Sequence, residues 1–426
     1  MALQNFFWYT IKTDMEKMEK VEILKQAIQK ELLKSVDAVS IIRFIELLIE
    51  YAYRSRASDV HLEPEEKDVK VRLRIDGVLQ DVFTFSKELQ SEVVARVKVL
   101  SELKTDIHHI PQDGRFRAKI RDLGEVDVRV SIVPTYYNEN VVLRILAEII
   151  PLSFEDMGFT SEQTLLINKA ISKPYGMILA NGPTGSGKTT TLYTLIKQLN
   201  TKDVSIITIE DPIEYSIKGI TQIPLNVQSG LTFATGLRSI LRQDPNIIMV
   251  GEIRDFETAN IAINAALTGH LMLSTLHTND AATTFPRLID MGVLPFLIAS
   301  TVNIVISQRL VRVVCKVCRK KRSLSVAEIK SLSLGGIDQN LMIDSIFTVG
   351  DGCKECDNTG YRNRIGIYEV LEVNDDIRTL IVSRADASQI KQMAVKNGMR
   401  TMLEDGLMKA QQGITTIEEV LRIIYE

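Results

Sequence analysis

The chain has 426 residues, 51 of them basic and 54 acidic, which gives a formal charge of −3 at pH 7. At about 100 to 200 residues per domain, this length predicts two or three domains, each able to bury its own core without disulfide bonds. The near balance of charge excludes a global positive field, so a generic protein for binding nucleic acid or an anionic membrane is disfavoured.

The first residues do not have the pattern of a secretory signal. Phe6, Phe7, Trp8 and Tyr9 are not followed by a long apolar run with a basic segment before it, so we expect the protein to stay in the cytoplasm. Apolar residues at helical spacing predict one amphipathic helix over 15–34 and a second over 39–54. We therefore interpret residues 1–56 as a short helical extension.

The pattern changes to alternation from Asp68. Apolar residues at every second position up to Ile75, followed by Asp76-Gly77, predict a strand and a hairpin turn. Further strands are predicted over 115–120 and 126–133. These elements indicate an α+β domain over residues 57–150, and the stretch 151–158 has the composition of a linker.

Buried-strand candidates then alternate with helical patterns, which predicts a largely parallel α/β sheet within residues 151–426. The apolar run 295–311 is too short for a membrane span of about 20 residues and contains polar side chains, so we predict a buried helix there. Helical spacing returns over 374–426. The predicted strands are 177–180, 204–209, 247–250 and 271–275.

A phosphate-binding loop is predicted at 182–189, where the sequence fits GxxxxGK[ST] between a strand and a helix. Glycines let backbone N–H groups surround phosphate oxygens, and the start of the helix adds its positive dipole end. Lys188 supplies a cation for the outer phosphates, and Thr189 can ligate Mg²⁺. The predicted nucleotide-binding residues are Gly182, Pro183, Thr184, Gly185, Ser186, Gly187, Lys188 and Thr189.

Hydrolysis needs a carboxylate near the phosphate-binding loop, and three predicted strands end on polar groups. Glu252 follows the strand 247–250, which we expect to lie beside the strand that precedes the loop. Glu210 and Glu214 follow the strand 204–209, and His277 follows 271–275. Carboxyl ends of parallel strands meet at one edge of a sheet, so we expect these groups to surround the γ-phosphate.

All four cysteines form two CxxC pairs, at Cys315 and Cys318 and at Cys353 and Cys356. Two such turns together supply the four thiolates of a tetrahedral zinc site, whereas a redox dithiol usually needs one pair. A complete Cys₄ shell leaves no position for substrate, so the predicted zinc ion is structural. It would hold together the segment 312–360.

Four motifs in this order resemble the secretion ATPases that power type II secretion and type IV pilus assembly, the GspE/PilB type. They are the Walker A loop 182–189, the aspartate box 209–214, the Walker B stretch ending at Glu252, and the histidine box from Thr268-Gly-His270 through His277. The resemblance continues before them, in Ser58-Asp-Val-His61, Arg74-Ile-Asp-Gly77, Pro111 to Arg115 and Val126 to Ser131. One departure is Asn138, where the family commonly has glycine before the glutamate.

The resemblance implies a RecA-like P-loop NTPase domain with a Cys₄ zinc insertion, preceded by a smaller α+β, PAS-like domain. It implies an ATPase that uses ATP and Mg²⁺, with Glu252, a carboxylate of the aspartate box and His270 or His277 around the phosphates. Arginines of the preceding domain reach the nucleotide in such motors, which nominates Arg115, Arg129 and Arg144 as catalytic arginines.

The same resemblance implies a homohexamer at the cytoplasmic face of the inner membrane, associated with the membrane through a platform protein. Assembly and secretion motors carry the tetracysteine insertion and retraction motors lack it, which favours assembly or secretion over a retraction or competence-pilus motor. Two alternatives lie outside the motor class. A nucleic-acid translocase is disfavoured by the charge balance and by the lack of an aromatic and basic groove pattern. A nucleotide-gated scaffold that does not hydrolyse ATP stays open.

Overall fold

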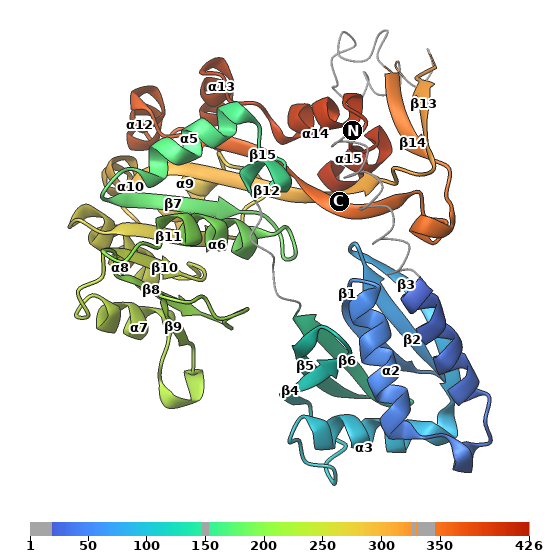
Figure 1. Ribbon diagram of the computed structural model, residues 1–426. Helices are drawn as coiled ribbons and strands as arrows, with labels where there is room; N and C mark the ends of the chain where they lie inside the picture. Colours follow the sequence, from blue (N-terminus) through green and yellow to red (C-terminus); the bar gives the residue numbers. More distant parts are fainter. Residues whose placement is uncertain (1–18, 147–152, 326–328, 330–345, 426) are drawn as a thin grey trace. The chain divides into compact units, whose positions relative to one another are not determined.

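The computed structural model describes residues 19–146, 153–325, 329 and 346–425 (Figure 1). The chain divides into two compact units, Met1–Glu148 and Ile149–Glu426, which we call the amino-terminal and carboxyl-terminal units. Among the described residues, no helix is both long enough and apolar enough to cross a membrane.

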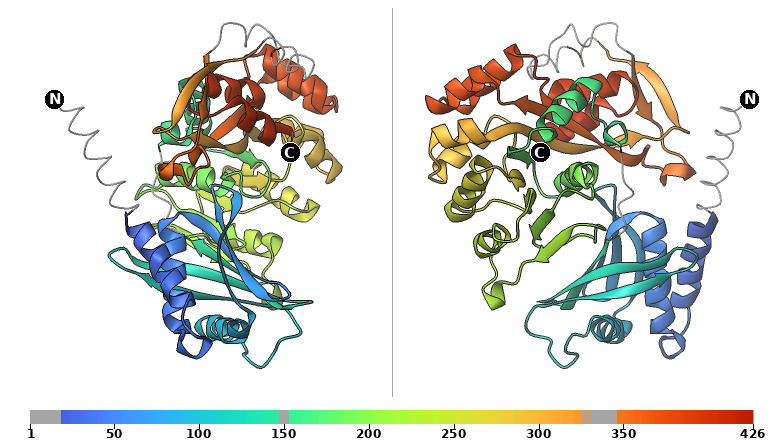
Figure 2. Two further views of the ribbon diagram at one scale, coloured as in Figure 1. Left: turned by 90° about the vertical axis from the view of Figure 1, so that its right-hand side faces the viewer. Right: turned by 60° about the vertical axis from the view of Figure 1, so that its left-hand side comes forward.

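The amino-terminal unit is a six-stranded antiparallel sheet in the order β3-β2-β1-β6-β5-β4. Figure 2 shows helices against one face of this sheet, where Phe44, Leu48, Val60, Val128 and Leu143 are almost fully buried. The elements are a helix over 19–32, η1 (Val36–Ala38), α2 (Ile41–Arg54), β1 (Ala57–Pro64), β2 (Asp68–Ile75), β3 (Val78–Ser86), η2 (Lys87–Leu89), α3 (Gln90–Leu100), β4 (Gln112–Ile120), β5 (Gly124–Thr135) and β6 (Asn138–Leu146).

Two turns of this unit follow from local backbone chemistry. The predicted hairpin is confirmed: β2 and β3 are joined by Asp76 (φ 49°) and Gly77 (φ 87°), a pair that tolerates the positive φ values of a two-residue hairpin. Asn138, at the β5–β6 turn, has φ 110°. The position where this chain departs from the family's glycine therefore still has a backbone conformation that favours glycine.

The carboxyl-terminal unit is built on a seven-stranded sheet in the order β15-β12-β7-β11-β10-β8-β9, parallel except for β15. Its strands are β7 (Gly176–Asn181), β8 (Ile206–Glu210), β9 (Thr221–Pro224), β10 (Ile247–Val250), β11 (Leu271–Leu276), β12 (Val302–Val314) and β15 (Tyr361–Glu372). A separate antiparallel pair consists of β13 (Arg319–Ser323) and β14 (Ile346–Gly350). The four predicted strands and the parallel α/β fold are confirmed.

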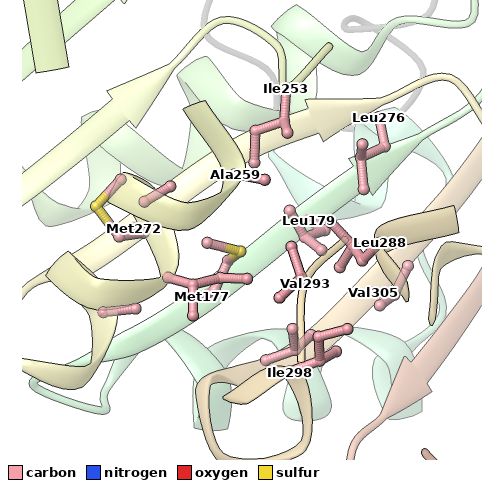
Figure 3. Close-up of a cluster of buried hydrophobic side chains, with 14 of the residues drawn as sticks. Met177, Leu179, Ile253, Ala259, Met272, Leu276, Leu288, Val293, Ile298 and Val305 are labelled. Atoms are coloured by element: carbon pink, nitrogen blue, oxygen red, sulfur yellow. The ribbon is translucent and has the colours of Figure 1, made fainter. Parts of the chain in front are cut away.

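Helices cover both faces of this sheet because its strands are apolar on both sides. On β7, Met177 and Leu179 pack into one buried cluster, drawn in Figure 3, and Ile178 and Ala180 into another. The helices are α4 (Phe154–Met157), α5 (Ser161–Ile171), α6 (Lys188–Leu199), η3 (Val227–Ser229), α7 (Phe233–Ile240), α8 (Phe256–Leu267), α9 (Thr284–Asp290), α10 (Pro295–Thr301), η5 (Lys354–Cys356), α12 (Asp375–Val382), α13 (Ala387–Lys396), α14 (Met402–Gln411) and α15 (Ile417–Tyr425).

The prediction of one buried helix over 295–311 was wrong for most of that segment. Only α10 is helical, and β12 begins at Val302 and lies parallel to β7. The run from Val302 is rich in β-branched residues, which favour a strand. The apolar composition indicated burial correctly, but a short apolar run does not distinguish a buried helix from a buried strand.

The predicted linker 151–158 contains a short helix. Residues 147–152 lie outside the described residues, but α4 follows directly with a capping box between Ser153 and Asp156. Phe154 and Met157 of this helix are buried in the carboxyl-terminal unit. These two apolar side chains therefore anchor α4 to the core of the carboxyl-terminal unit.

The last helix, α15, is fixed to β12 through the buried carboxylate of Glu419. It accepts hydrogen bonds from Nε (3.0 Å) and Nη2 (2.7 Å) of Arg312 and from Nε (2.9 Å) of Arg422. Burial alone would raise the pKa of Glu419, but the two guanidinium groups outweigh burial and lower the pKa to about 2.

We expect this ion pair to make the stability of the carboxyl-terminal unit sensitive to acid. Because the folded pKa lies below the ordinary value of 4.5, Glu419 contributes about 3 kcal/mol above pH 5, and this contribution is lost as the pH falls from 4.5 to about 2. The measurement is urea unfolding of wild type and Glu419→Gln between pH 7 and pH 2.5. If the difference in free energy of unfolding between the two proteins does not decrease below pH 4.5, the assignment of a lowered pKa to Glu419 is contradicted.

Candidate functional site

The segment 182–187 joins the end of β7 to the start of α6, as the phosphate-binding motif requires. Gly182, Gly185 and Gly187 have φ values of 139°, 81° and 91°, which L side chains rarely adopt. Around Gly185 there is open space for a Cβ, so its conformation and not crowding requires glycine. The loop is therefore a backbone cradle of the kind that binds phosphate.

Lys188 and Thr189 lie in the first turn of α6, behind this loop. The Lys188 Nζ donates to the carbonyl oxygens of Gly182 (2.8 Å) and Pro183 (3.0 Å). Burial lowers the pKa of Lys188, and the Glu252 carboxylate opposes that shift. The ammonium group of Lys188 therefore lies against the backbone of the loop, close enough to Glu252 to interact with its charge.

Glu252 follows β10, whose carboxyl end lies at the same sheet edge as the loop. Its carboxylate contacts Arg254 and lies 3.2 Å from Nε2 of His277. Burial would raise the pKa of Glu252, but the Arg254 guanidinium and the His277 ring lower it below its ordinary range. The expectation that β10 lies beside β7 was wrong, because β11 lies between them. The carboxylate thus faces the loop from two strands away.

The two candidate histidines lie at opposite ends of β11. His277 follows the strand at the edge of the phosphate-binding loop, whereas His270 precedes it, with Nδ1 3.0 Å from the carbonyl oxygen of Ala265. The two histidines are seven residues apart along an extended strand, and seven steps of about 3.3 Å put roughly 23 Å between their Cα atoms. The geometry brings His277 to Glu252 and keeps His270 away from this loop.

Glu210, at the end of β8, is buried inside a hydrogen-bond network instead of facing open space. Its carboxylate accepts from the Tyr193 hydroxyl, from Thr208 Oγ1 (2.5 Å) and from Gln222 Nε2 (3.2 Å). The backbone N–H of Glu214 also approaches the Tyr193 hydroxyl, at 3.4 Å. Both oxygens of Glu210 are therefore engaged within the protein, and the network joins the aspartate box to α6.

The three nominated arginines form one row across the amino-terminal sheet. Arg115 of β4 is the direct partner of Arg129 on β5, and Arg129 is the direct partner of Arg144 on β6. Direct partners point to the same face, and like charges there repel one another. The row continues to Asp59 of β1, whose Oδ1 accepts from Arg144 Nε at 2.9 Å. The row thus places three guanidinium groups side by side, with a carboxylate at its β1 end.

The four cysteines also come together, and the distances between them test the predicted metal. A tetrahedral site with Zn–S bonds of about 2.3 Å places its sulfurs about 3.8 Å apart. The Cys315–Cys353 and Cys318–Cys356 sulfur distances are 3.8 Å, and Cys353–Cys356 is 3.7 Å. All four sulfurs lie within 4.8 Å of one another, and none is in a disulfide. The cluster fits a four-coordinate zinc ion.

One residue that contacts the phosphate-binding loop was not predicted from the sequence. Gln308 lies on β12, some 120 positions after the loop, and its buried side chain donates to the Ser186 carbonyl oxygen at 2.7 Å. Nothing in the local sequence distinguishes it from the neighbouring polar residues of the same apolar run. The signal would have been the order of the strands, which places β12 next to β7.

A glycine-rich loop after a strand of a parallel sheet, with a lysine, a carboxylate and a histidine at the same edge, defines a P-loop ATPase. Residues 34–422 match the family described as Type II/IV secretion system protein. The chain belongs to this family.

Curated relatives cover almost the whole chain. The type IV pilus assembly ATPase PilB of Myxococcus xanthus is 41% identical over 416 residues, 95% of this chain and 71% of the relative. The type II secretion system protein E of Xanthomonas campestris is 48% identical over 384 residues, 90% of this chain and 67% of the relative. PilB of Thermus thermophilus is 46% identical over 95% of this chain, which spans about half (46%) of that relative.

Solved structures agree with the fold. The pilus retraction motor PilT with bound ADP matches with a TM-score of 0.61 and 28% identity, over 89% of this chain and 96% of that one. The ATPase DotB of Legionella pneumophila matches with a TM-score of 0.67 and 23% identity, over 92% of this chain and 98% of that one. The second likeness concerns the fold alone.

Proposed function

We propose that the chain hydrolyses Mg²⁺-bound ATP as one subunit of a homohexameric ring, and that this work drives assembly of a type IV pilus or a type II secretion filament through a platform protein of the inner membrane. The observation that carries the proposal is the combination of Lys188, Glu252 and His277 at one sheet edge with the four-cysteine cluster. Relatives named for pilus assembly and for type II secretion support both filament types.

Within the site, Lys188 and the loop amides would hold the phosphates, Thr189 would ligate Mg²⁺ and Glu252 would position the attacking water. His277, which lies beside Glu252, would contact the γ-phosphate side, and His270 would not act on this nucleotide. Since both oxygens of Glu210 are engaged, we assign it the positioning of α6 and β8. Glu214 stays the predicted catalytic member of the aspartate box.

The arginine row supports the ring. We propose that Arg115, Arg129 and Arg144 contact the nucleotide of a neighbouring subunit, which would neutralise the repulsion between them. We expect Arg115→Gln to lower turnover about tenfold or more. The matched control is Arg117→Gln on the same strand, because Arg117 already pairs with Asp127 at 3.2 Å. If Arg117→Gln is as inactive as Arg115→Gln, the loss of turnover does not support a specific contact between Arg115 and the nucleotide.

Mixing two inactive variants tests whether the arginines act between subunits. Lys188→Ala carries intact arginines and Arg115→Gln an intact loop, so mixed rings would recover a measurable fraction of turnover. Equal inactivity of the mixture and of the separate variants would place the arginine and the loop in one subunit or exclude a ring. The ring itself is checked by light scattering of the ATPase-active fraction.

The cellular role is tested by deleting the gene in the source organism and restoring it as wild type or Glu252→Gln. Loss of surface pili, or of secreted enzymes, in both the deletion and the Glu252→Gln strain would support an assembly or secretion motor. A hyperpiliated deletion strain would indicate retraction instead. Turnover that depends on added DNA and disappears at high salt would favour a translocase.

A further inference from the structure

The phosphate-binding loop rests on a second strand that its motif does not include. β12 lies next to β7, and Gln308 on it is 1% exposed. A buried amide costs free energy unless its polar atoms are paired. Gln308 Nε2 donates to the Ser186 carbonyl oxygen at 2.7 Å, and its Oε1 accepts from Thr191 Oγ1 at 2.7 Å. Both bonds therefore end on the loop and its helix.

The packing of the loop on Gln308 is close enough to restrict the motif itself. A Cβ on Gly182 would lie 2.4 Å from the backbone oxygen of Gln308, and a Cβ on Gly187 would lie 3.1 Å from its Nε2. Two of the three loop glycines are thus needed partly because β12 is there. Gln308 forms the floor of the loop.

The bond to Ser186 also orients the next peptide group. Across a trans peptide plane the C=O and the following N–H point in opposite directions. Holding the Ser186 carbonyl oxygen on Gln308 turns the Gly187 N–H away from Gln308, toward the opposite side of the loop. Backbone N–H groups presented in this way are what a P-loop uses to bind phosphate.

We infer that Gln308 is a positioning residue for the nucleotide: it fixes the Ser186–Gly187 peptide group so that the loop is shaped for phosphate before the nucleotide binds. This inference rests on nucleotide binding at the loop, as proposed above. It predicts that the loss of the amide weakens nucleotide binding by more than its effect on stability explains.

The same strand provides a matched control. Asn303 is a second buried amide on β12, and it donates to the Tyr175 carbonyl oxygen at 3.1 Å. It lies at the opposite end of β7, where a Cβ on Gly176 would come within 2.2 Å of its Nδ2. Replacing Asn303 with leucine therefore removes a comparable amide-to-backbone bond without touching the phosphate-binding loop.

The experiment measures binding of a fluorescent ADP analogue with Mg²⁺, and urea unfolding, for wild type, Gln308→Met and Asn303→Leu. We expect at least tenfold weaker binding for Gln308→Met and less than twofold for Asn303→Leu, with similar losses of stability in both. Equal affinity of Gln308→Met and wild type would overturn the inference. Failure of wild type to bind the analogue would instead overturn the proposed function.

A variant with the shape of glutamine separates positioning from packing. Gln308→Glu replaces the donor facing the Ser186 oxygen by a carboxylate, which repels that oxygen when charged and can donate to it when protonated. We expect its affinity, relative to wild type, to be at least tenfold lower at pH 8 and to recover as the pH falls to 5.5. A ratio independent of pH would show that only packing at this position matters.

Discussion

Replacement of Glu252 by glutamine is expected to lower ATP turnover by a factor of about 100 or more and to leave nucleotide binding nearly unchanged. The substitution keeps the shape of the side chain and removes a negative charge that lies beside Arg254 and His277 and acts on Lys188. That charge would orient the attacking water, a role that matters in the transition state more than in the bound ground state. Steady-state phosphate release and analogue binding measure the two effects separately.

The matched control for this charge is Glu257→Gln. Glu257 is an exposed carboxylate five residues further along, on α8, where it pairs with Arg238. We expect the Glu257→Gln variant to keep at least half of the wild-type turnover. Comparable losses in both variants would mean that Glu252 acts through fold or assembly. Full turnover in Glu252→Gln would move the catalytic carboxylate to the aspartate box, where Glu214 is the candidate.

The phosphate-binding loop could be predicted from the sequence because its chemistry is local. The glycines, the lysine and the hydroxyl stand at fixed spacing within eight consecutive residues, so the motif identifies the loop even when its distant contacts are unknown. The order of the strands in the sheet could not be predicted from such a local pattern. Glu252 was expected one strand from the loop and lies two strands away, because β11 inserts between β7 and β10 although it follows both in the chain.

Because strand order could not be predicted, the contact of Gln308 with the loop and the alignment of the three arginines could not be predicted either. Periodicity specifies which residues are buried, but the partner of a strand depends on pairing over a hundred residues or more. The contact of Gln308 with the loop depends on the pairing of β12 with β7, which the sequence pattern does not specify. The arginines were nominated by resemblance, and their row appears only in the register of β4, β5 and β6. The two CxxC pairs were predictable because a zinc site has a spacing of its own.

Removal of zinc is expected to have the second large effect, on stability and not on chemistry. The four cysteines join the start of β13 to the turn after β14, and this pair packs through Phe347 against α14 and α15. Without the ion, the four Zn–S bonds that link the two CxxC turns are absent, so we expect the segment to lose its structure. Structural zinc binding contributes about 10 kcal/mol in small domains. A loss of even about 5 kcal/mol would lower the melting temperature by roughly 10 °C or more.

Metal analysis of protein purified without chelator should give one zinc ion per chain. Cys356→Ser, or wild type after chelation, should lack the ion and melt at the lower temperature. Val317→Ser is the matched control, because Val317 lies between Cys315 and Cys318 and is 69% exposed. Since the phosphate-binding loop packs on β7 and β12 through other residues, analogue affinity below the melting temperature should fall less than threefold. Absence of bound metal, or equal melting temperatures, would contradict a structural zinc site.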